Sequence, residues 1–137
     1  MVIATVRAST ACTPESSVAA PLTTSAWRLE QIVYNDDTIY RPEPGGAYRI
    51  QFTIDGRITG RLSANNLMGN YLVAKDRIRI IALATTRAQP PEGNIEAEVL
   101  RAFGQVDLFR VRGEELLMML KFDSGTMIFK RETPLIR

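Results

Sequence analysis

The stretch "AYRIQFTIDGRITGRL", residues 47–62, places the strongest constraint on the fold of this chain. Apolar and polar side chains alternate on both sides of the dipeptide Asp55-Gly56. Asp-Gly between two alternating runs is a strong hairpin signal, because both residues accept the positive φ angles of a tight turn. Alternation also indicates a sheet with one buried face and one face in water. We therefore predict an antiparallel sheet built around this hairpin.

Further strand-like runs lie on both sides of the hairpin. A first strand begins at Trp27 in "AWRLEQIV", and "LMGNYLVAKDRIRIIAL" predicts two strands around a turn at Lys75-Asp76. Three more runs follow near the C-terminus: "QVDLFRVR", "ELLMMLKF" and "TMIFKR". The turns between these runs are short, and short turns join antiparallel neighbours because parallel strands need long crossovers.

One segment, "NIEAEVLRAF", has the period of a helix. Ile95, Val99 and Phe103 lie four residues apart, which places them on one face. Asn94 is the predicted N-cap, and Gly104 is predicted to end the helix in a left-handed conformation. This is the one helix that we predict.

The predicted fold is α+β: an antiparallel meander of about eight strands curled into a half-barrel, with one α-helix packed on it. The length of 137 residues indicates a single domain. We assign residues 26–132 to this domain. Residues 1–25, rich in Ala, Ser, Thr and Pro, are predicted to be a flexible tail or a signal remnant, and residues 133–137 a C-terminal tail.

Composition excludes several function classes. There is no histidine, so the commonest metal ligand and the commonest general base near neutral pH are missing. The single cysteine, Cys12, cannot form an internal disulfide or a cysteine metal site. A net charge of +2, with Lys and Arg spread along the chain, does not favour nucleic acid. No apolar run is long enough for a transmembrane helix. We expect no cofactor and no metal.

The N-terminus "MVIATVRASTAC" allows two interpretations. Small residues precede Cys12, as they do before the lipidated cysteine of a lipoprotein signal. However, Ser9 stands where a leucine-like residue is usual, and Arg7 interrupts a short apolar stretch. A flexible tail is the favoured interpretation, and lipidation at Cys12 is the alternative.

Candidate catalytic groups are few. The pairs Asp36-Asp37 and Glu114-Glu115 lie in predicted turns, where acidic residues are common for structural reasons. Adjacent residues on a strand point to opposite faces, so neither pair converges on a substrate. Ser63, Ser124 and Thr126 are candidate hydroxyl nucleophiles, but the chain has no histidine to act as their base. The sequence therefore predicts a protein that is not an enzyme.

Three other features have a structural and a functional interpretation. Trp27 is expected to anchor the core rather than to bind a ligand. The run "LLMMLKF" is expected to be core, although methionines also suit an adaptable apolar wall. Arg87, next to Pro90-Pro91, could bind an anion, but we expect it to bridge loops by donating to several carbonyls.

The order of these segments resembles the META domain, or HslJ-like, family. The resemblance covers roughly residues 25–131 and consists of four motifs in order. The matching residues are Trp27 and Leu29 in the opening strand, Phe52, Asp55, Gly56 and Gly60 in the hairpin, Asn65, Gly69 and Tyr71 in "SANNLMGNY", and Thr86 and Arg87 in "TTRAQPP".

The chain departs from the family pattern at both motif cysteines. Ala64 stands at the first cysteine position, Ser63 at the glycine before it, and "AQPP" replaces the stretch that holds the second. If the two cysteines are paired in the family, we would expect both to be lost together, as they are in this chain. We expect Asn65 to hold this segment instead, by bonding backbone across the turn.

The resemblance implies a non-enzymatic domain of the bacterial cell envelope, often secreted or lipid-anchored; a cytoplasmic location is the alternative. Relatives are associated with stress response, antibiotic tolerance and secretion. The leading hypothesis is a binding or accessory domain whose concave face, lined by Ile50, Phe52, Leu117 and Met119, holds a lipid, another apolar ligand or a partner peptide. One alternative is partner binding by strand addition at a sheet edge. An enzyme of unknown class is the third hypothesis.

Overall fold

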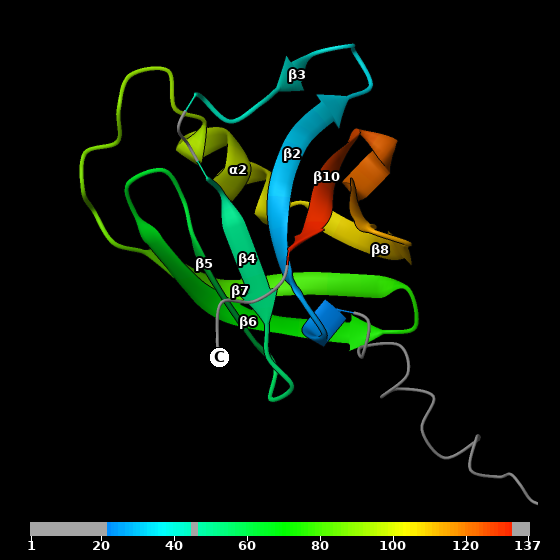
Figure 1. The fold of residues 1–137 in the computed structure, drawn as a ribbon. Helices are drawn as coiled ribbons and strands as arrows, with labels where there is room; N and C mark the ends of the chain where they lie inside the picture. The colour runs from blue at the N-terminus through cyan, green and yellow to red at the C-terminus, as the bar shows by residue number, and fades with distance from the viewer. Residues whose placement is uncertain (1–21, 45–46, 133–137) are drawn as a thin grey trace, which may run out of the picture.

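The computed structural model describes residues 22–44 and 47–132, so Cys12 and the predicted 133–137 tail lie outside the described residues. The strands are β2 (Ala26–Tyr34), β3 (Ile39–Tyr40), β4 (Arg49–Phe52), β5 (Arg57–Arg61), β6 (Asn66–Ala74), β7 (Arg77–Thr85), β8 (Val106–Arg112), β9 (Glu115–Leu120) and β10 (Gly125–Glu132). The helix α2 covers Glu96–Phe103, and the short 3₁₀ helix η2 covers Lys121–Asp123. Figure 1 shows these elements in order along the chain.

The strands form a closed barrel, not a half-barrel. From β4 to β10 each strand pairs antiparallel with the next one in the chain, and β2 pairs with β4. The first and last strands then pair with each other, from Gly125 opposite Tyr34 to Glu132 opposite Ala26. The antiparallel meander with a packed helix is confirmed, but the predicted open side of the half-barrel is wrong. Strand β3 adds only a short extension to β2.

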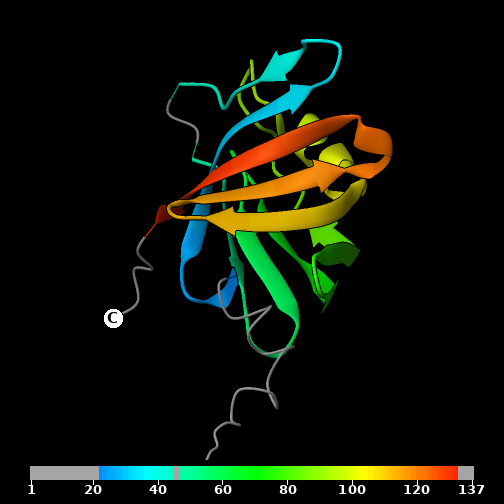
Figure 2. The ribbon, with the colours of Figure 1, turned by 90° about the vertical axis from the view of Figure 1, so that its right-hand side faces the viewer.

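Closure follows from the apolar faces of the two terminal strands. Trp27 and Ile32 of β2 are fully buried, as are Met127 and Phe129 of β10. Each strand would expose this face, and a row of unpaired backbone groups, if the sheet stayed open. Pairing β2 with β10 buries both faces and removes two sheet edges. In Figure 2 the strands β8, β9 and β10 lie side by side and carry the sheet round to β2.

One seam of the barrel is weak. Strands β7 and β8 share a single register pair, Arg77 opposite Leu108, supported by a bond from the Phe109 amide to the Asp76 carbonyl at 2.9 Å. The connection between these strands contains α2, and they diverge beyond this pair. In the part of the chain that the structure describes, most of β7 therefore has no strand partner on its β8 side.

Helix α2 fills the core with the predicted face. Val99, Ala102 and Phe103 are buried, and the ring of Phe103 stacks on Phe129 of β10 at 6.3 Å between centroids. The Asn94 side chain accepts from the Glu96 amide at 2.9 Å, although the geometric N-cap is Ile95.

The C-terminal cap of α2 differs from the prediction. Gly104 has φ −71° and is right-handed, so the predicted left-handed cap is wrong. Its amide still bonds the Leu100 carbonyl at 3.2 Å, because the helical turn continues directly towards β8.

The predicted hairpin at Asp55-Gly56 is present. Gly56 has φ +92°, a conformation that favours glycine, in the turn between β4 and β5. Gly60 on β5 lies directly against β4: a Cβ there would stand 2.3 Å from the Arg49 carbonyl oxygen. This contact explains why a glycine occupies an otherwise regular strand.

Candidate functional site

A buried polar cluster is centred on Asn65, between β5 and β6. The turn is closed by the Leu62 amide, which donates to the Asn65 carbonyl at 2.7 Å, and the Asn65 side chain points inward. Its Nδ2 donates to the Ala88 carbonyl at 2.9 Å, and its Oδ1 accepts from the Ala88 amide at 2.5 Å. The Thr86 hydroxyl also donates to Oδ1, at 2.8 Å. One side chain thus joins two segments more than 20 residues apart.

Glu96, at the start of α2, completes this cluster. Its Oε1 accepts from Asn65 Nδ2 at 2.8 Å, and its Oε2 accepts from the Ala64 amide at 2.7 Å. The carboxylate is buried, with 7% of the residue exposed, and both oxygens are occupied. A negative charge in the first turn of a helix is also favoured by the helix dipole. We call Asn65, Thr86, Ala88 and Glu96 the Asn65 cluster.

A second polar group lies beside the first. Glu43 accepts from the Tyr48 hydroxyl at 2.7 Å and also from the Ser63 hydroxyl. The Tyr48 hydroxyl in turn accepts from the Ile95 amide at 3.0 Å, which links this group to the helix start. Burial acts to raise the pKa of Glu43, but the hydrogen bonds from Ser63 and Tyr48 leave that pKa below its usual value. Burial raises the pKa of Tyr48 well above the ordinary tyrosine value.

The motif residue Tyr71 braces the hairpin turn. Its hydroxyl donates to the Thr53 carbonyl at 2.6 Å, and its amide donates to the Gly56 carbonyl at 2.9 Å. Its ring meets Phe52 edge-on, with centroids 4.9 Å apart. Burial, and secondly the charge of Asp55, raise the pKa of Tyr71. Asp55, Gly56 and Tyr71, which the sequence placed in separate motifs, form one structural unit.

The remaining motif residues have different surroundings. Trp27 is fully buried, donates its indole N–H to the Leu22 carbonyl at 3.1 Å, and lies under the guanidinium of Arg131. Gly69 of β6 faces the Ile81 carbonyl oxygen, which would lie 3.0 Å from a Cβ. Arg87 is exposed, and no hydrogen bond or ion pair within residues 22–44 and 47–132 involves it. The predicted loop bridge is therefore made by Asn65 rather than by Arg87.

The four residues predicted to form one ligand face do not share a face. Ile50 and Phe52 point into the barrel and are buried in the core. On β9 the inward positions are Leu116, Met118 and Leu120, while Leu117 and Met119 lie on the other side of the sheet. A shift of one residue along a strand exchanges the two faces, and a continuous apolar run carries no signal that fixes this choice. The prediction that these four residues line one face is therefore wrong.

The groups considered for catalysis are held in local bonds. Asp36 accepts from the Thr38 amide at 3.0 Å within the β2–β3 turn, and the Ser124 hydroxyl donates to the Lys121 carbonyl at 2.9 Å. Glu114 forms an exposed ion pair with Arg131 at 3.7 Å. Within the described residues, no three acidic or cysteine side chains gather as a metal site would need.

An apolar surface that the sequence did not predict lies on the hairpin of β6 and β7. Met68 and Leu72 of β6 are 57% and 54% exposed, and Ile81 of β7 is 37% exposed. Ile81 pairs with Asn70, midway between the two β6 residues, so all three side chains share the outer face. We call Met68, Leu72 and Ile81 the hairpin patch. The alternation along β6 and β7 could have indicated the hairpin patch, because its apolar residues occupy the strand positions that alternate with the buried ones.

A hollow of about 330 Å³ adjoins the hairpin patch at the weak seam. Its walls are mostly apolar and come from β6, β7, β8 and η2. The lining residues are Leu72, Val73, Ala74, Arg77, Ile78, Arg79, Asp107 and Lys121.

A family model for the META domain matches residues 20–134. The chain belongs to the META domain family. The match includes the predicted 26–132 domain. It also contains the Asn65 cluster and the unit formed by Asp55, Gly56 and Tyr71. The search of curated proteins found no match. Among the described residues, no helix has the length and apolar character needed to cross a membrane.

Two solved structures share the fold. An NMR structure of a protein from Burkholderia xenovorans superposes with a TM-score of 0.72 at 21% identity, covering 96% of this chain and all of that one. A crystal structure of a DUF4847 family protein from Bacteroides vulgatus has a TM-score of 0.64 at 14% identity, covering 85% of this chain and 99% of that one. At these identities the comparison establishes the architecture.

Proposed function

We propose that this META-domain protein is a non-catalytic accessory protein of the bacterial cell envelope that binds a partner polypeptide through the outer face of β6 and β7. The observation that carries the proposal is the hairpin patch. Met68, Leu72 and Ile81 lie together on one face and adjoin the apolar hollow. Apolar side chains grouped in this way, with polar residues around them, are typical of interaction sites.

The charges around the hairpin patch define the chemistry of the partner. Arg57 and Arg79 border it on β5 and β7, and neither has an acidic partner in the described part of the chain. Arg77 is paired with Asp107 at 2.7 Å. An apolar surface edged by unpaired arginines complements a segment that combines apolar and acidic residues.

The barrel interior is a poorer candidate for the ligand. Large side chains from β2, α2 and β10, including Trp27, Phe103 and Phe129, pack there with almost no exposure. Among the described residues, the pairing of β10 with β2 closes the concave face on which the leading sequence hypothesis placed the ligand. Binding on the outside of the barrel requires no opening of this core.

The non-catalytic and envelope parts of the proposal rest on different arguments. Both oxygens of the buried Glu96 carboxylate are bonded to Asn65 and to backbone, which suits a structural role. The envelope location follows from family resemblance, and cell fractionation tests it. Recovery of the protein in the cytosolic fraction of its host would contradict this location.

Site-specific photo-crosslinking tests the binding surface. A photoreactive phenylalanine analogue replaces Leu72 in one variant and Ile39 in the control, because Ile39 is an exposed apolar residue on β3, which pairs with β2 and not with β6 or β7. We expect a discrete protein adduct from position 72 in host cells, none from position 39, and loss of the adduct when Arg79→Glu is added.

The captured protein is then identified by mass spectrometry and purified. When it is titrated into the ¹⁵N-labelled chain, chemical-shift changes are expected within residues 66–85. Changes confined to other surfaces, or no change, would overturn the proposal.

Strand addition at β7 is the second candidate function. It is favoured by the seam, where a single register pair joins β7 to β8. Against it, the strand carries a bulge at which Ala82 has φ +54°, and Arg77 and Arg79 lie on it; both features discourage edge pairing. Hydrogen exchange separates the two candidates: strand addition protects β7 amides when the partner binds, whereas side-chain docking leaves their exchange unchanged.

A further inference from the structure

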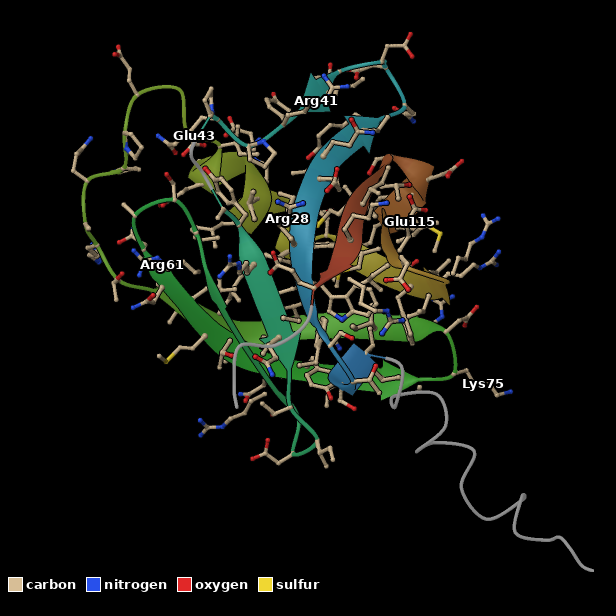
Figure 3. All side chains as sticks on the ribbon, in the orientation of Figure 1. Arg28, Arg41, Glu43, Arg61, Lys75 and Glu115 are labelled. Atoms are coloured by element: carbon tan, nitrogen blue, oxygen red, sulfur yellow. The ribbon has the colours of Figure 1, made fainter. Side chains whose placement is uncertain are left out.

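A continuous row of cationic side chains crosses four strands on the outside of the barrel. Lys130 of β10 lies opposite Arg28 of β2, Arg28 lies opposite Arg49 of β4, and Arg49 lies opposite Arg61 of β5. All four residues are exposed. Figure 3 shows Arg28 and Arg61 on either side of β4. Like charges directly opposite each other on neighbouring strands destabilise a sheet, so this row needs an explanation.

Acidic residues compensate the two arginines in the middle of the row. Glu132 contacts Arg28 at 3.8 Å and Arg49 at 3.0 Å, and Glu30 contacts Arg28 at 3.5 Å. At its two ends Lys130 and Arg61 have no carboxylate partner among the residues that the structure describes. The one side-chain hydrogen bond of Arg61 is long, 3.4 Å from Nη1 to the Asn66 side-chain oxygen. On the β5 side of the row, the uncompensated positive charge therefore lies at Arg61, directly opposite Arg49.

A polar hollow of about 440 Å³ lies at this same pair. Arg49 and Arg61 line it, together with Ala47, Leu62 and Ser63. The Ser63 hydroxyl donates to Glu43, so the guanidinium groups of Arg49 and Arg61 supply the remaining side-chain donors of the hollow. Arg49 uses its Nε for the ion pair with Glu132, and a guanidinium carries further N–H groups beyond that one.

We propose that Arg49 and Arg61 form a binding site for a phosphoryl group. The site lies on β4 and β5, apart from the hairpin patch, and does not depend on the proposed partner binding. Its occupant is a tetrahedral, multiply charged oxyanion, supplied by free phosphate or a phosphate ester in solution or by the phosphomonoester headgroup of a lipid.

Two physical arguments favour this ligand class. Guanidinium groups bind phosphate oxygens with paired N–H···O bonds, and two guanidinium groups on directly opposite residues can share one phosphate. A dianion between them also reduces the cross-strand repulsion that the Arg49–Glu132 ion pair leaves at Arg61. The carboxylate of Glu43 lies at the Ser63 end of the hollow and confines an anion to the arginine end.

An NMR titration with inorganic phosphate tests the site. Phosphate is added to the ¹⁵N-labelled chain at constant ionic strength, with chloride as the balancing ion. We expect saturable shifts at Arg49, Arg61 and Ser63. Arg61→Gln should weaken binding by about tenfold or more, which corresponds to about 1.4 kcal/mol.

The matched control is Arg57→Gln. Arg57 lies on the same strand and the same face, but it is opposite Asn70 instead of an arginine. Binding by Arg57→Gln should equal that of the unmodified protein. A melting-temperature increase with phosphate should likewise occur in the unmodified protein and in Arg57→Gln, and be absent in Arg61→Gln.

Vesicle binding distinguishes the two sources of the phosphoryl group. Phosphatidylcholine vesicles with and without phosphatidic acid are sedimented with each variant. Arg61-dependent binding to phosphatidic acid vesicles supports a lipid headgroup, and saturable phosphate binding without vesicle binding supports a soluble anion. Absence of both kinds of binding would overturn the proposal. An equal loss of binding in Arg57→Gln and Arg61→Gln would show diffuse electrostatic attraction and would also overturn it.

Discussion

The buried amide of Asn65 donates to the carboxylate of Glu96 across 2.8 Å, from the β5–β6 turn to the first residue of α2. The same amide is bonded to both backbone groups of Ala88. One side chain therefore joins the β5–β6 turn to two positions more than 20 residues later in the chain, Ala88 and Glu96. In this chain the Asn65 cluster links the two segments that hold cysteines in the family pattern.

Replacing Asn65 should lower stability strongly. Asn65→Ala leaves the Ala88 backbone groups and Oε1 of the buried Glu96 carboxylate without their partner, at a cost of about 3 kcal/mol of unfolding free energy. Urea unfolding measures this change in the free energy of unfolding. The neighbouring Asn66→Ala is the control, because its side chain is exposed and its only side-chain bond is the long one to Arg61; the expected change is about 0.5 kcal/mol or less. Equal effects of the two substitutions would contradict the role of Asn65.

The bond between Asn65 and Glu96 should appear as an energetic coupling. A double-mutant cycle with Asn65→Ala and Glu96→Ala is expected to give a coupling energy of about 1–3 kcal/mol, because the residues share a direct buried hydrogen bond. Asn65→Ala paired with Glu98→Ala provides the control, since Glu98 lies on the same helix and its side chain takes part in no hydrogen bond or ion pair within the described residues. Additive effects in the first cycle would show that Asn65 and Glu96 act independently.

Two glycine substitutions should have opposite effects. Gly60→Ala places a Cβ 2.3 Å from the Arg49 carbonyl and should cost about 1–3 kcal/mol by overpacking between β4 and β5. Gly104→Ala should stabilise the protein by about 0.4–1 kcal/mol, because φ is −71° and the nearest atom is 3.5 Å away. Thermal unfolding of both variants measures their change in stability relative to the unmodified protein. Destabilisation by Gly104→Ala would indicate the left-handed cap that the sequence suggested.

The low pKa of Glu43 makes one contribution to stability dependent on pH. A carboxylate whose pKa is lowered on folding stabilises the folded state above its unfolded pKa, near 4.5, and this contribution is lost as the pH falls through the folded value. The stability advantage over Glu43→Gln should thus be present at neutral pH and disappear in acid. By NMR, the Glu43 carboxyl should titrate below 4.5, and Ser63→Ala should raise its midpoint. An unchanged midpoint would exclude the Ser63 bond as a cause.

Local elements were predictable because their signals are local. The Asp55-Gly56 turn, the strands around Lys75-Asp76 and the helical period ending at Phe103 each depend on residues a few positions apart. The family motifs were also visible, since they are short patterns in a fixed order. The Gly104 cap was mispredicted because glycine permits either hand, and only the direction of the following chain selects one.

The sequence by itself determined the antiparallel meander, the position of the helix and membership of the META family. The tertiary structure alone decided that β10 pairs with β2, that Leu117 and Met119 point away from the core, and that Arg28, Arg49 and Arg61 stand in one row. These features depend on strand register and on contacts between residues up to about a hundred positions apart. Side-chain alternation specifies that a strand has two faces, but only packing against distant strands determines which face is buried and which strands become neighbours.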